Sequence, residues 1–280
     1  MARGWLITGC SSGLGLALTR AVLEAGDSVV ATSRRASPLE ALAAEFPDRL
    51  TVTRLELTDP GACAAAVELA QDRLDGIDVL VNNAAVGLFG AVEEISDAEL
   101  REQLEVLAVA PWRLSRLVLP LMRARGGGHI VNVSSLAGRT GFAGLGAYVA
   151  GKFALEGMSL TLAAEAAPFG VRVTVMEPGG FATSYGTSMT EAADRLPVYT
   201  EALAPMHGAL RGMADNAELN RPEHFAELVL RAVADPAAPL RLPVGPDAYG
   251  FLTAAHAAEA ADLAAGQALS GALQPAPDPA

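Results

Sequence analysis

Short apolar runs alternate with helical patterns along the first two thirds of the chain. The expected strands are Trp5–Thr8, Ser28–Thr32, Leu50–Leu55, Val79–Val81, His129–Val133 and Val171–Met176, and the expected helices are Leu14–Ala25, Pro38–Phe46, Ala62–Leu74, Asp97–Arg125 and Tyr148–Pro168. Alternation of helices with apolar strands is typical of a parallel sheet that helices cover on both faces. We therefore expect an α/β fold built on a doubly wound parallel sheet, which binds its ligands at the carboxyl ends of the strands.

The rest of the chain extends this pattern and shows no linker to a second domain. A helix over Pro222–Ala234, a short strand over Leu240–Pro243 and an Ala-rich helix over Ala248–Leu269 are expected. Between about residues 183 and 220 the pattern weakens while Met, Pro and Gly accumulate, which predicts an insertion that covers a substrate. We expect one domain over residues 1–273 and a disordered Pro/Ala tail over residues 274–280.

The composition excludes several classes of protein. A net charge of −12 argues against nucleic-acid or anionic-membrane partners, because these need basic surfaces. Two cysteines, Cys10 and Cys63, are too few for a disulfide framework, which fits a reducing cytoplasm. We find neither a signal peptide nor an apolar run of the roughly eighteen residues that a membrane span needs. The four histidines lack metal-ligand spacing, so we expect a cytoplasmic protein without a metal site.

A glycine-rich turn follows the first expected strand and opens the first helix, with the sequence Thr8-Gly9-Cys10-Ser11-Ser12-Gly13-Leu14-Gly15. Glycine permits the tight turn and lets the backbone approach a pyrophosphate, which then meets free N–H groups at the helix N-terminus. An ordinary strand–helix turn is the alternative, but this position in an alternating chain favours dinucleotide binding. The expected contacts are Gly9, Ser11, Ser12, Gly13, Leu14 and Gly15.

The end of the second expected strand indicates which nucleotide would bind. A carboxylate there would bind the ribose 2′-hydroxyl of NAD, whereas an arginine accommodates the 2′-phosphate of NADP. Ser33 stands where the acid would be, and Arg34 and Arg35 follow it, with no acid until Glu40. The alternative is a solvated arginine pair. Two cations at this point of an acidic chain favour NADP(H) over NAD(H).

Lys152 is the only lysine in the chain, since all the other basic residues are arginine. It stands four residues after Tyr148, so on a helix both side chains point the same way. A compact ammonium beside a phenol suggests a tyrosine tuned as a general acid. A chance surface lysine is the alternative, because the YxxxK spacing alone is a weak pattern.

Taken together, these motifs resemble the short-chain dehydrogenase/reductase family over about residues 5–183. They occur in the family's order: Thr8–Gly15, then Asn82-Asn83-Ala84-Ala85, Asn132-Val133-Ser134-Ser135, the Tyr148/Lys152 pair, and Pro178-Gly179 followed by Thr183. The resemblance implies a Rossmann fold, a nicotinamide cofactor and hydride exchange between an alcohol and a ketone. It also implies a homo-oligomer, either a dimer or a tetramer.

The resemblance also implies a role for each matching residue. Ser135 would bind the substrate oxygen, Tyr148 would exchange the proton, and Lys152 would bind the nicotinamide ribose and lower the pKa of Tyr148. A nearby cation lowers a phenol pKa by about 1–3 units from its usual value near 10. The further cofactor contacts implied are Glu56, Leu57, Asn83, Ala84, Ala85, Pro178, Gly179, Phe181 and Thr183.

One position departs from the family pattern. Family members place an asparagine in the middle of the long helix after the Asn82–Ala85 motif, and here the matching residue is Leu107. Leucine can neither donate nor accept a hydrogen bond, so the usual proton relay cannot be built from it. Gln103, one turn earlier, could partly substitute. Either activity is reduced, protons take another route, or the substrate needs no fast relay.

The sequence supports two hypotheses for function. The first is an NADP-dependent oxidoreductase acting on the carbonyl or alcohol of a medium-sized apolar or cyclic metabolite. The second is a family member with altered or lost redox turnover, either a non-redox catalyst of ring rearrangement or a nucleotide-binding protein, and Leu107 is the feature that suggests it. Tyr185 and Met189 could cover an apolar substrate or simply pack locally. Cys10 is expected to be packing rather than a nucleophile.

Overall fold

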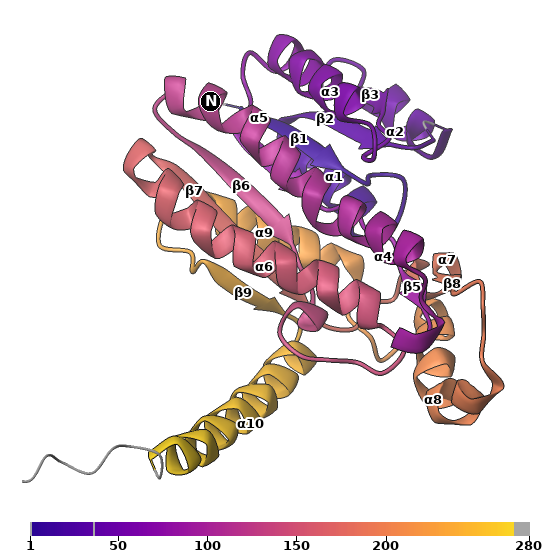
Figure 1. Cartoon of the computed structure of the whole chain (residues 1–280). Coiled ribbons are helices and arrows are strands. Elements are labelled where there is room, and N and C mark those ends of the chain that lie inside the picture. The colour runs from indigo at the N-terminus through magenta and orange to yellow at the C-terminus, as the bar shows by residue number, and fades with distance from the viewer. Residues whose placement is uncertain (1, 36, 272–280) are drawn as a thin grey trace, which may run out of the picture.

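The computed structural model describes residues 2–35 and 37–271 and has a seven-stranded parallel sheet at its centre (Figure 1). The strand order is β3-β2-β1-β4-β6-β7-β9. β2 and β3 lie on one side of β1 and all the later strands lie on the other side, so the strand order switches between β1 and β4. The strands are β1 (Gly4–Thr8), β2 (Ser28–Ser33), β3 (Leu50–Arg54), β4 (Val79–Asn82), β6 (Gly128–Val133), β7 (Val171–Pro178) and β9 (Arg241–Val244). The expected doubly wound α/β fold is confirmed.

Helices cover both faces of this sheet. One core contains α1 (Gly13–Glu24), α2 (Glu40–Glu45) and α9 (Pro222–Ala234), and the other contains α3 (Pro60–Arg73), α5 (Ala110–Ala124) and α6 (Gly146–Ala166). Alternate strand residues enter opposite cores, as Trp5 and Leu6 of β1 do. Burial on both faces explains why the central strands β1 and β4 are almost continuous apolar runs.

A line of buried amides and hydroxyls ties α6 to the sheet. Asn82 of β4 donates to the side-chain oxygen of Asn132 on β6 at 2.8 Å. Asn132 in turn donates to Ser159 of α6 at 2.8 Å, and Ser159 donates to the carbonyl of Leu155 at 2.6 Å. Because buried polar groups lose free energy when they are left unpaired, this line fixes the rotation of α6 against the sheet.

The helix expected over Asp97–Arg125 is present from Asp97 to Ala124, but a π-helical turn interrupts its α-helical repeat. The structure has α4 (Asp97–Leu104), a π-helical turn η3 (Glu105–Val109) and then α5. A π-helical turn inserts an extra residue into the α-helical repeat, and such turns often occur at functional sites. Apolar periodicity does not reveal one inserted residue, because the pattern continues on either side. The turn contains Leu107.

Residues 183–220, which we call the 183–220 segment, carry several short elements: α7 (Tyr185–Ser188), β8 (Thr190–Glu191), η6 (Pro197–Tyr199), α8 (Thr200–Arg211) and η7 (Met213–Asp215). β8 pairs in parallel with β5 (Leu88–Phe89) in a separate two-stranded sheet, which was too short to predict. The carboxylate of Glu94 anchors the segment by accepting from the Leu196 amide at 2.7 Å and from Arg195 at 3.0 Å.

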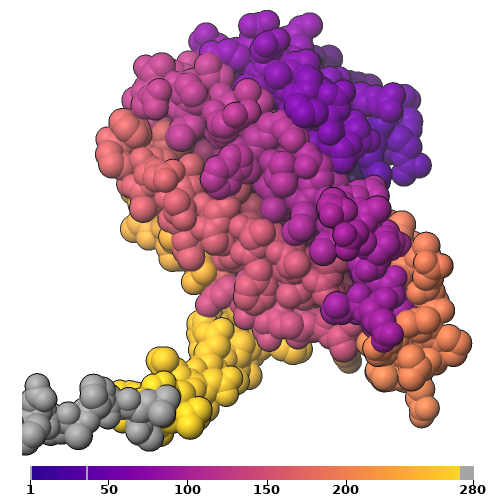
Figure 2. All heavy atoms as spheres, viewed as in Figure 1, coloured from indigo at the N-terminus to yellow at the C-terminus, as the bar shows by residue number. Residues whose placement is uncertain are grey.

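The C-terminal helix α10 (Pro246–Gly271) begins against the body and then extends away from it (Figures 1 and 2). Its buried residues are Ala248 and Leu252, both in its first two turns. No helix in the described ranges combines the length and apolarity that crossing a membrane requires. The expected tail over residues 274–280 lies outside the described residues. The remaining short helices are η1 (Ser37–Leu39), η2 (Val92–Glu94), η4 (Leu136–Gly138) and η5 (Ala167–Phe169).

Candidate active site

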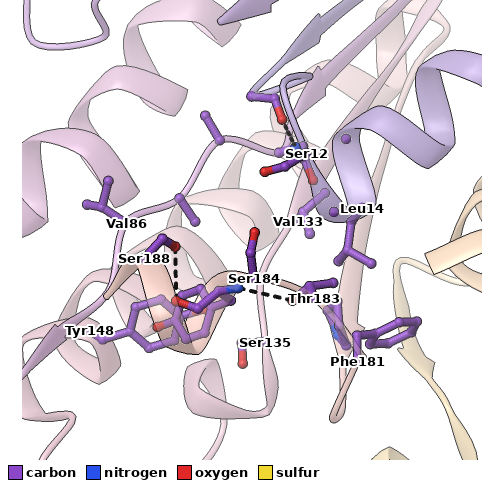
Figure 3. Close-up of a pocket in the computed structure, with 18 of the residues that line it drawn as sticks. Ser12, Leu14, Val86, Val133, Ser135, Tyr148, Phe181, Thr183, Ser184 and Ser188 are labelled. Carbon is purple, nitrogen blue, oxygen red and sulfur yellow. Dashed lines mark hydrogen bonds between the residues drawn. The ribbon is translucent and has the colours of Figure 1, made fainter. Parts of the chain in front are cut away.

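A cavity of about 780 Å³ opens at the carboxyl ends of the parallel strands. Figure 3 shows Ser12 toward the top of the view, Ser135 and Tyr148 toward the bottom, and Thr183 at a height between them. The structure brings every site residue expected from the sequence to the wall of this cavity: Gly9, Ser11, Ser12, Gly13, Leu14, Gly15, Arg34, Arg35, Glu56, Leu57, Asn83, Ala84, Ala85, Ser135, Tyr148, Lys152, Pro178, Gly179, Phe181 and Thr183.

The glycine-rich turn is shaped by contacts that only glycine allows. Gly9 has a φ of +73°, and a Cβ there would lie 2.7 Å from the Cα of Ala84. A Cβ on Gly15 would lie 2.3 Å from the carbonyl oxygen of Gly9. Ser12 precedes α1 without a side-chain cap, so its side chain does not satisfy the amides of the first helical turn. The residues present therefore fit a dinucleotide, whose pyrophosphate such amides bind.

Asn83 follows β4, the strand next to β1, and stabilises the glycine-rich turn from there. Its side-chain amide donates to the carbonyl oxygens of Thr8 at 2.8 Å and Gly9 at 3.2 Å. The Thr8 hydroxyl accepts from the backbone amides of Asn83 at 3.0 Å and Ala84 at 3.1 Å. The side chain of Asn83 thus holds the glycine turn in shape, while the segment after it lines the cavity.

Arg34 and Arg35 lie at the end of β2, exposed at the rim of the cavity. Ser33 is buried, and its hydroxyl donates to the carbonyl oxygen of Arg35. Neither arginine forms an ion pair with the residues that the structure describes. Both guanidinium groups are therefore available to an anion at this end of the cavity.

Tyr148 and Lys152 face inward from the first two turns of α6, with 8% and 2% of their surface exposed. The Lys152 ammonium donates to the carbonyl oxygen of Val133 at 2.7 Å and lies 5.7 Å from the centre of the Tyr148 ring. Ser135 begins η4, and its hydroxyl accepts from the Ala137 amide at 3.2 Å. The i, i+4 spacing therefore places the phenol and the ammonium on one buried face, as expected.

The expectation that Lys152 lowers the pKa of Tyr148 is wrong for this structure. Burial raises the pKa of the Tyr148 phenol above its usual value of 10.0, against a lowering effect of the nearby Ser135 and Tyr185 hydroxyls. Burial also lowers the pKa of Lys152 to about 8, although Glu156 opposes this shift. Loss of water disfavours the charged form of both groups, and it is the largest cause of both shifts.

Leu107 packs against α6, the helix that carries Tyr148 and Lys152. It is fully buried in η3, and a Cβ on Gly151 would lie 2.8 Å from its side chain. Val106 lines the cavity. Gln103 is buried too, and its side-chain oxygen has no hydrogen-bond partner among the described residues. Leu107 thus fills its place with apolar contacts alone.

The far side of the cavity is mainly apolar and comes from widely separated segments. Sequence reasoning did not identify these residues, because no motif marks them and tertiary folding alone gathers them: Phe142, Leu145, Met206, Leu210, Met213, Leu219 and Phe251. Tyr185 also lines the cavity, whereas Met189 packs in the core beside Leu107 and Phe89. Of the two alternatives given above, Tyr185 is placed to cover a substrate, whereas Met189 packs locally.

Three other expected residues sit close to the glycine turn. The Phe181 ring packs edge-on against Phe225 in the core at 6.3 Å, so only part of it reaches the cavity. The methyl of Thr183 faces the turn, since a Cβ on Gly13 would lie 3.4 Å from it. Cys10 is buried, and burial raises the pKa of its thiol to about 12, which fits packing and not a nucleophile.

Comparison with known proteins agrees with this geometry. The family described as "short chain dehydrogenase" matches residues 4–194. The chain is 38% identical to Oxidoreductase BOA17 of Botryotinia fuckeliana over 90% of this chain and 92% of that protein. A crystal structure of a short-chain dehydrogenase from Streptomyces avermitilis has a TM-score of 0.89 and 38% identity, covering 98% of each chain. A metagenomic short-chain oxidoreductase in complex with NADP has a TM-score of 0.69 and 27% identity, covering 87% of this chain and 97% of that one. The glycine turn, the Ser135, Tyr148 and Lys152 side chains and these matches lead to one conclusion: the chain belongs to the short-chain dehydrogenase/reductase family of oxidoreductases.

Proposed function

We propose that this protein is an NADP-dependent oxidoreductase that reduces the carbonyl, or oxidises the alcohol, of a medium-sized apolar metabolite. The observation that carries the proposal is the position of Tyr148. Its phenol and Ser135 line the same cavity as the glycine turn and the apolar wall. A substrate carbonyl placed there meets a proton donor on one side and a dinucleotide site on the other.

The chain's own residues would hold the substrate oxygen and supply the proton. When bound, the nicotinamide supplies or accepts the hydride. Ser135 and Tyr148 would donate hydrogen bonds to the oxygen, and Tyr148 would pass its proton to it during reduction. Because burial raises the pKa of Tyr148, the phenol keeps its proton at neutral pH. This state favours proton donation to a carbonyl over proton removal from an alcohol.

Lys152 would hold the nicotinamide ribose and keep a positive charge near Tyr148. A pKa of about 8 leaves most of the lysine charged at neutral pH. Its bond to the Val133 carbonyl uses one of three donors, so two remain for ribose hydroxyls. The glycine turn and the segment 83–85 would hold the rest of the dinucleotide.

Arg34 and Arg35 support the preference for NADP. Ser33 offers no carboxylate to a ribose 2′-hydroxyl, and both guanidinium groups face the cavity rim. A planar guanidinium binds phosphate through paired, charge-assisted hydrogen bonds. The NADP complex of the metagenomic relative is consistent with this choice.

The apolar far wall supports a substrate that is largely hydrocarbon. Phe142, Met206, Leu210, Met213 and Phe251 would surround everything beyond the reacting carbonyl. Such a wall binds by excluding water from apolar surface, at roughly 25 cal/mol per Å² buried. A ring or a branched chain would fill this space better than a small polar metabolite.

The test is NADPH consumption with a panel of cyclic ketones, aliphatic ketones and 3-oxo esters. We expect turnover with apolar ketones, and a loss of about 10²–10⁴-fold in Tyr148→Phe with NADPH binding retained. Unchanged turnover in Tyr148→Phe would remove the phenol from the chemistry.

A second candidate function rests on Leu107. If NADPH binds but none of the ketones oxidises it, the protein has lost ordinary redox turnover. It would then be a nucleotide-binding protein, or a non-redox catalyst that uses Tyr148 as an acid for ring rearrangement. The buried, apolar contacts of Leu107 beside Gly151 favour this candidate, because they leave no polar group at the usual relay position.

A further inference from the structure

Tyr185 carries a buried hydroxyl that nothing in the proposed function uses. It is the first residue of α7, and its ring lies 5.6 Å from the Tyr148 ring at an angle of 55°. Its side chain lines the cavity, yet its oxygen is buried and has no hydrogen-bond partner within the described chain. An unsatisfied buried hydroxyl destabilises a fold, so its presence requires an explanation.

Neighbouring contacts hold this ring in place. A Cβ on Gly87 would lie 2.8 Å from the Tyr185 oxygen, so the hydroxyl lies directly over Gly87. Gly186 packs tightly against the end of α8, and Arg211 donates to its carbonyl oxygen at 3.0 Å. The ring of Tyr185 therefore cannot swing toward solvent without moving α7 away from α8.

The Tyr185 hydroxyl lies close to the Tyr148 phenol without forming a hydrogen bond of good geometry with it. The two groups are near enough to affect each other, because Tyr185 acts to lower the pKa of Tyr148. After burial, Tyr148 is the main cause that raises the pKa of Tyr185 well above its usual value. Tyr185 therefore keeps its proton and is the neutral donor of the pair.

Besides Tyr185, the Ser135 hydroxyl and the Lys152 ammonium lie near Tyr148 and can stabilise negative charge on it. The titratable side chains on this part of the wall are Lys152 of α6, Glu102 of α4, Tyr185 of α7 and Asp247 of α10. The carboxylate of Asp247 already accepts hydrogen bonds from the Gly180 amide at 2.6 Å and from the Asn220 side chain at 2.7 Å. Glu156, one turn beyond Lys152, pairs with Arg241 at 3.2 Å. From η3, Leu107 offers no polar group.

We propose that Tyr185 is a positioning residue for the reaction, which donates its hydroxyl to the oxygen of Tyr148 when that oxygen carries negative charge. This inference rests on the proposed function of Tyr148. During reduction the Tyr148 O–H bond breaks, the alcohol O–H bond forms, and the electron pair stays on the Tyr148 oxygen. The hydride from NADPH supplies both electrons to the carbonyl carbon. Tyr185 keeps its own proton and supplies only a hydrogen bond.

The substitution Tyr185→Phe tests this role, because it removes the hydroxyl and keeps the ring. Tyr199→Phe is the matched control, since the Tyr199 hydroxyl lies in the same segment but donates to Glu93 at 2.6 Å, away from the cavity. The ultraviolet absorbance of tyrosinate is titrated on the NADP⁺ complex from about pH 6 to about pH 12, because burial raises the Tyr148 pKa above 10.0. The chain has four tyrosines, and the step that is absent in Tyr148→Phe belongs to Tyr148.

We expect Tyr185→Phe to move the Tyr148 step upward by about one pH unit, as loss of a hydrogen bond to the charged form predicts. With the most rapidly oxidised alcohol of the panel, kcat at neutral pH should fall about tenfold and recover at high pH, while KM stays unchanged. Tyr199→Phe should behave like the wild type in both measurements.

An unshifted Tyr148 step in Tyr185→Phe overturns the inference, and so does a change confined to KM, which would make Tyr185 only a substrate contact. Full activity in Tyr148→Phe overturns the proposed function instead. The two failures are distinguishable because they appear in different variants.

Discussion

The two ends of the cavity are built in different ways. The end proposed for the nucleotide comes mostly from the first 85 residues, with Lys152 and the segment 178–183 completing it, and its shape depends on backbone geometry at Gly9, Gly13 and Gly15. The substrate end comes from side chains between residues 86 and 251, such as Phe142, Met206 and Phe251. A turn of a few residues can specify the first, whereas only the complete fold assembles the second. This difference explains why the family, but not the substrate, could be inferred from motifs.

The two ends also differ in what holds them in place. Backbone and amide bonds between β1 and β4 fix the nucleotide end, through Asn83 and Thr8. Charged side chains anchor the 183–220 segment at the substrate end. Glu94 forms an ion pair with Arg195 at 3.0 Å, and Glu191 forms one with Arg211 at 2.7 Å. Exposed ion pairs contribute little each, so the largely buried Glu94 is the main anchor.

The largest expected effect is at the nucleotide end. Gly15→Ala places a Cβ 2.3 Å from the Gly9 carbonyl oxygen, so the turn must shift. We expect NADPH binding to weaken about 100-fold or more, since strain of about 3 kcal/mol falls on the bound conformation. Fluorescence titration with NADPH measures it. Gly141→Ala is the control, because a Cβ there meets open space. Equal binding by both variants would show that the backbone of the turn does not decide affinity.

The next effect separates the two nucleotides. Arg34→Ala should weaken NADPH binding about 10- to 100-fold through the loss of a charge-assisted phosphate contact, and leave NADH binding nearly unchanged. Titration with both nucleotides measures the ratio. Equal losses for NADPH and NADH would exclude Arg34 from the 2′-phosphate site.

A smaller effect is expected at the substrate end. Although burial acts to raise it, bonds from Leu196, Ala91 and Arg195 hold the pKa of Glu94 below its usual value. The anchor is therefore intact above pH 4.5 and is lost as the pH falls through the lowered value. Glu94→Gln should raise the substrate KM several-fold, roughly 1 kcal/mol, and leave NADPH binding unchanged. A parallel loss of NADPH binding would mean that the two ends are not independent.

The smallest expected effects are at the N-termini of α1 and α3. Asp59 caps α3 by accepting from the amides of Gly61 at 2.8 Å and Ala62 at 3.2 Å, whereas Ser12 makes no such bond at α1. Asp59→Ala should lower the free energy of unfolding by about 1 kcal/mol and leave NADPH binding unchanged. Ser12→Ala should do the reverse, with little loss of stability and weaker NADPH binding. Urea unfolding and NADPH titration distinguish the two, and a stability loss in Ser12→Ala would mean that this residue caps its helix after all.

Sequence reasoning was most successful where the signal is local. The apolar runs predict all seven strands of the main sheet to within a few residues, because burial on both faces makes the central strands largely apolar. The Gly9–Gly15 turn and the i, i+4 spacing of Tyr148 and Lys152 likewise depend on neighbours in the chain. Every expected site residue therefore lies on one cavity wall.

The tertiary structure decided what depends on distant neighbours. The pairing of β5 with β8 joins two-residue strands about a hundred residues apart, so no local pattern marks it. The π-helical turn holds Leu107 against Gly151 of α6, a contact between residues more than forty positions apart that no local pattern marks. The direction of the Tyr148 pKa shift depends on desolvation, which a sequence does not display. The sequence by itself thus determined the sheet, the glycine turn and the pair on α6, while burial and long-range contacts determined the apolar wall and the place of Tyr185 beside Tyr148.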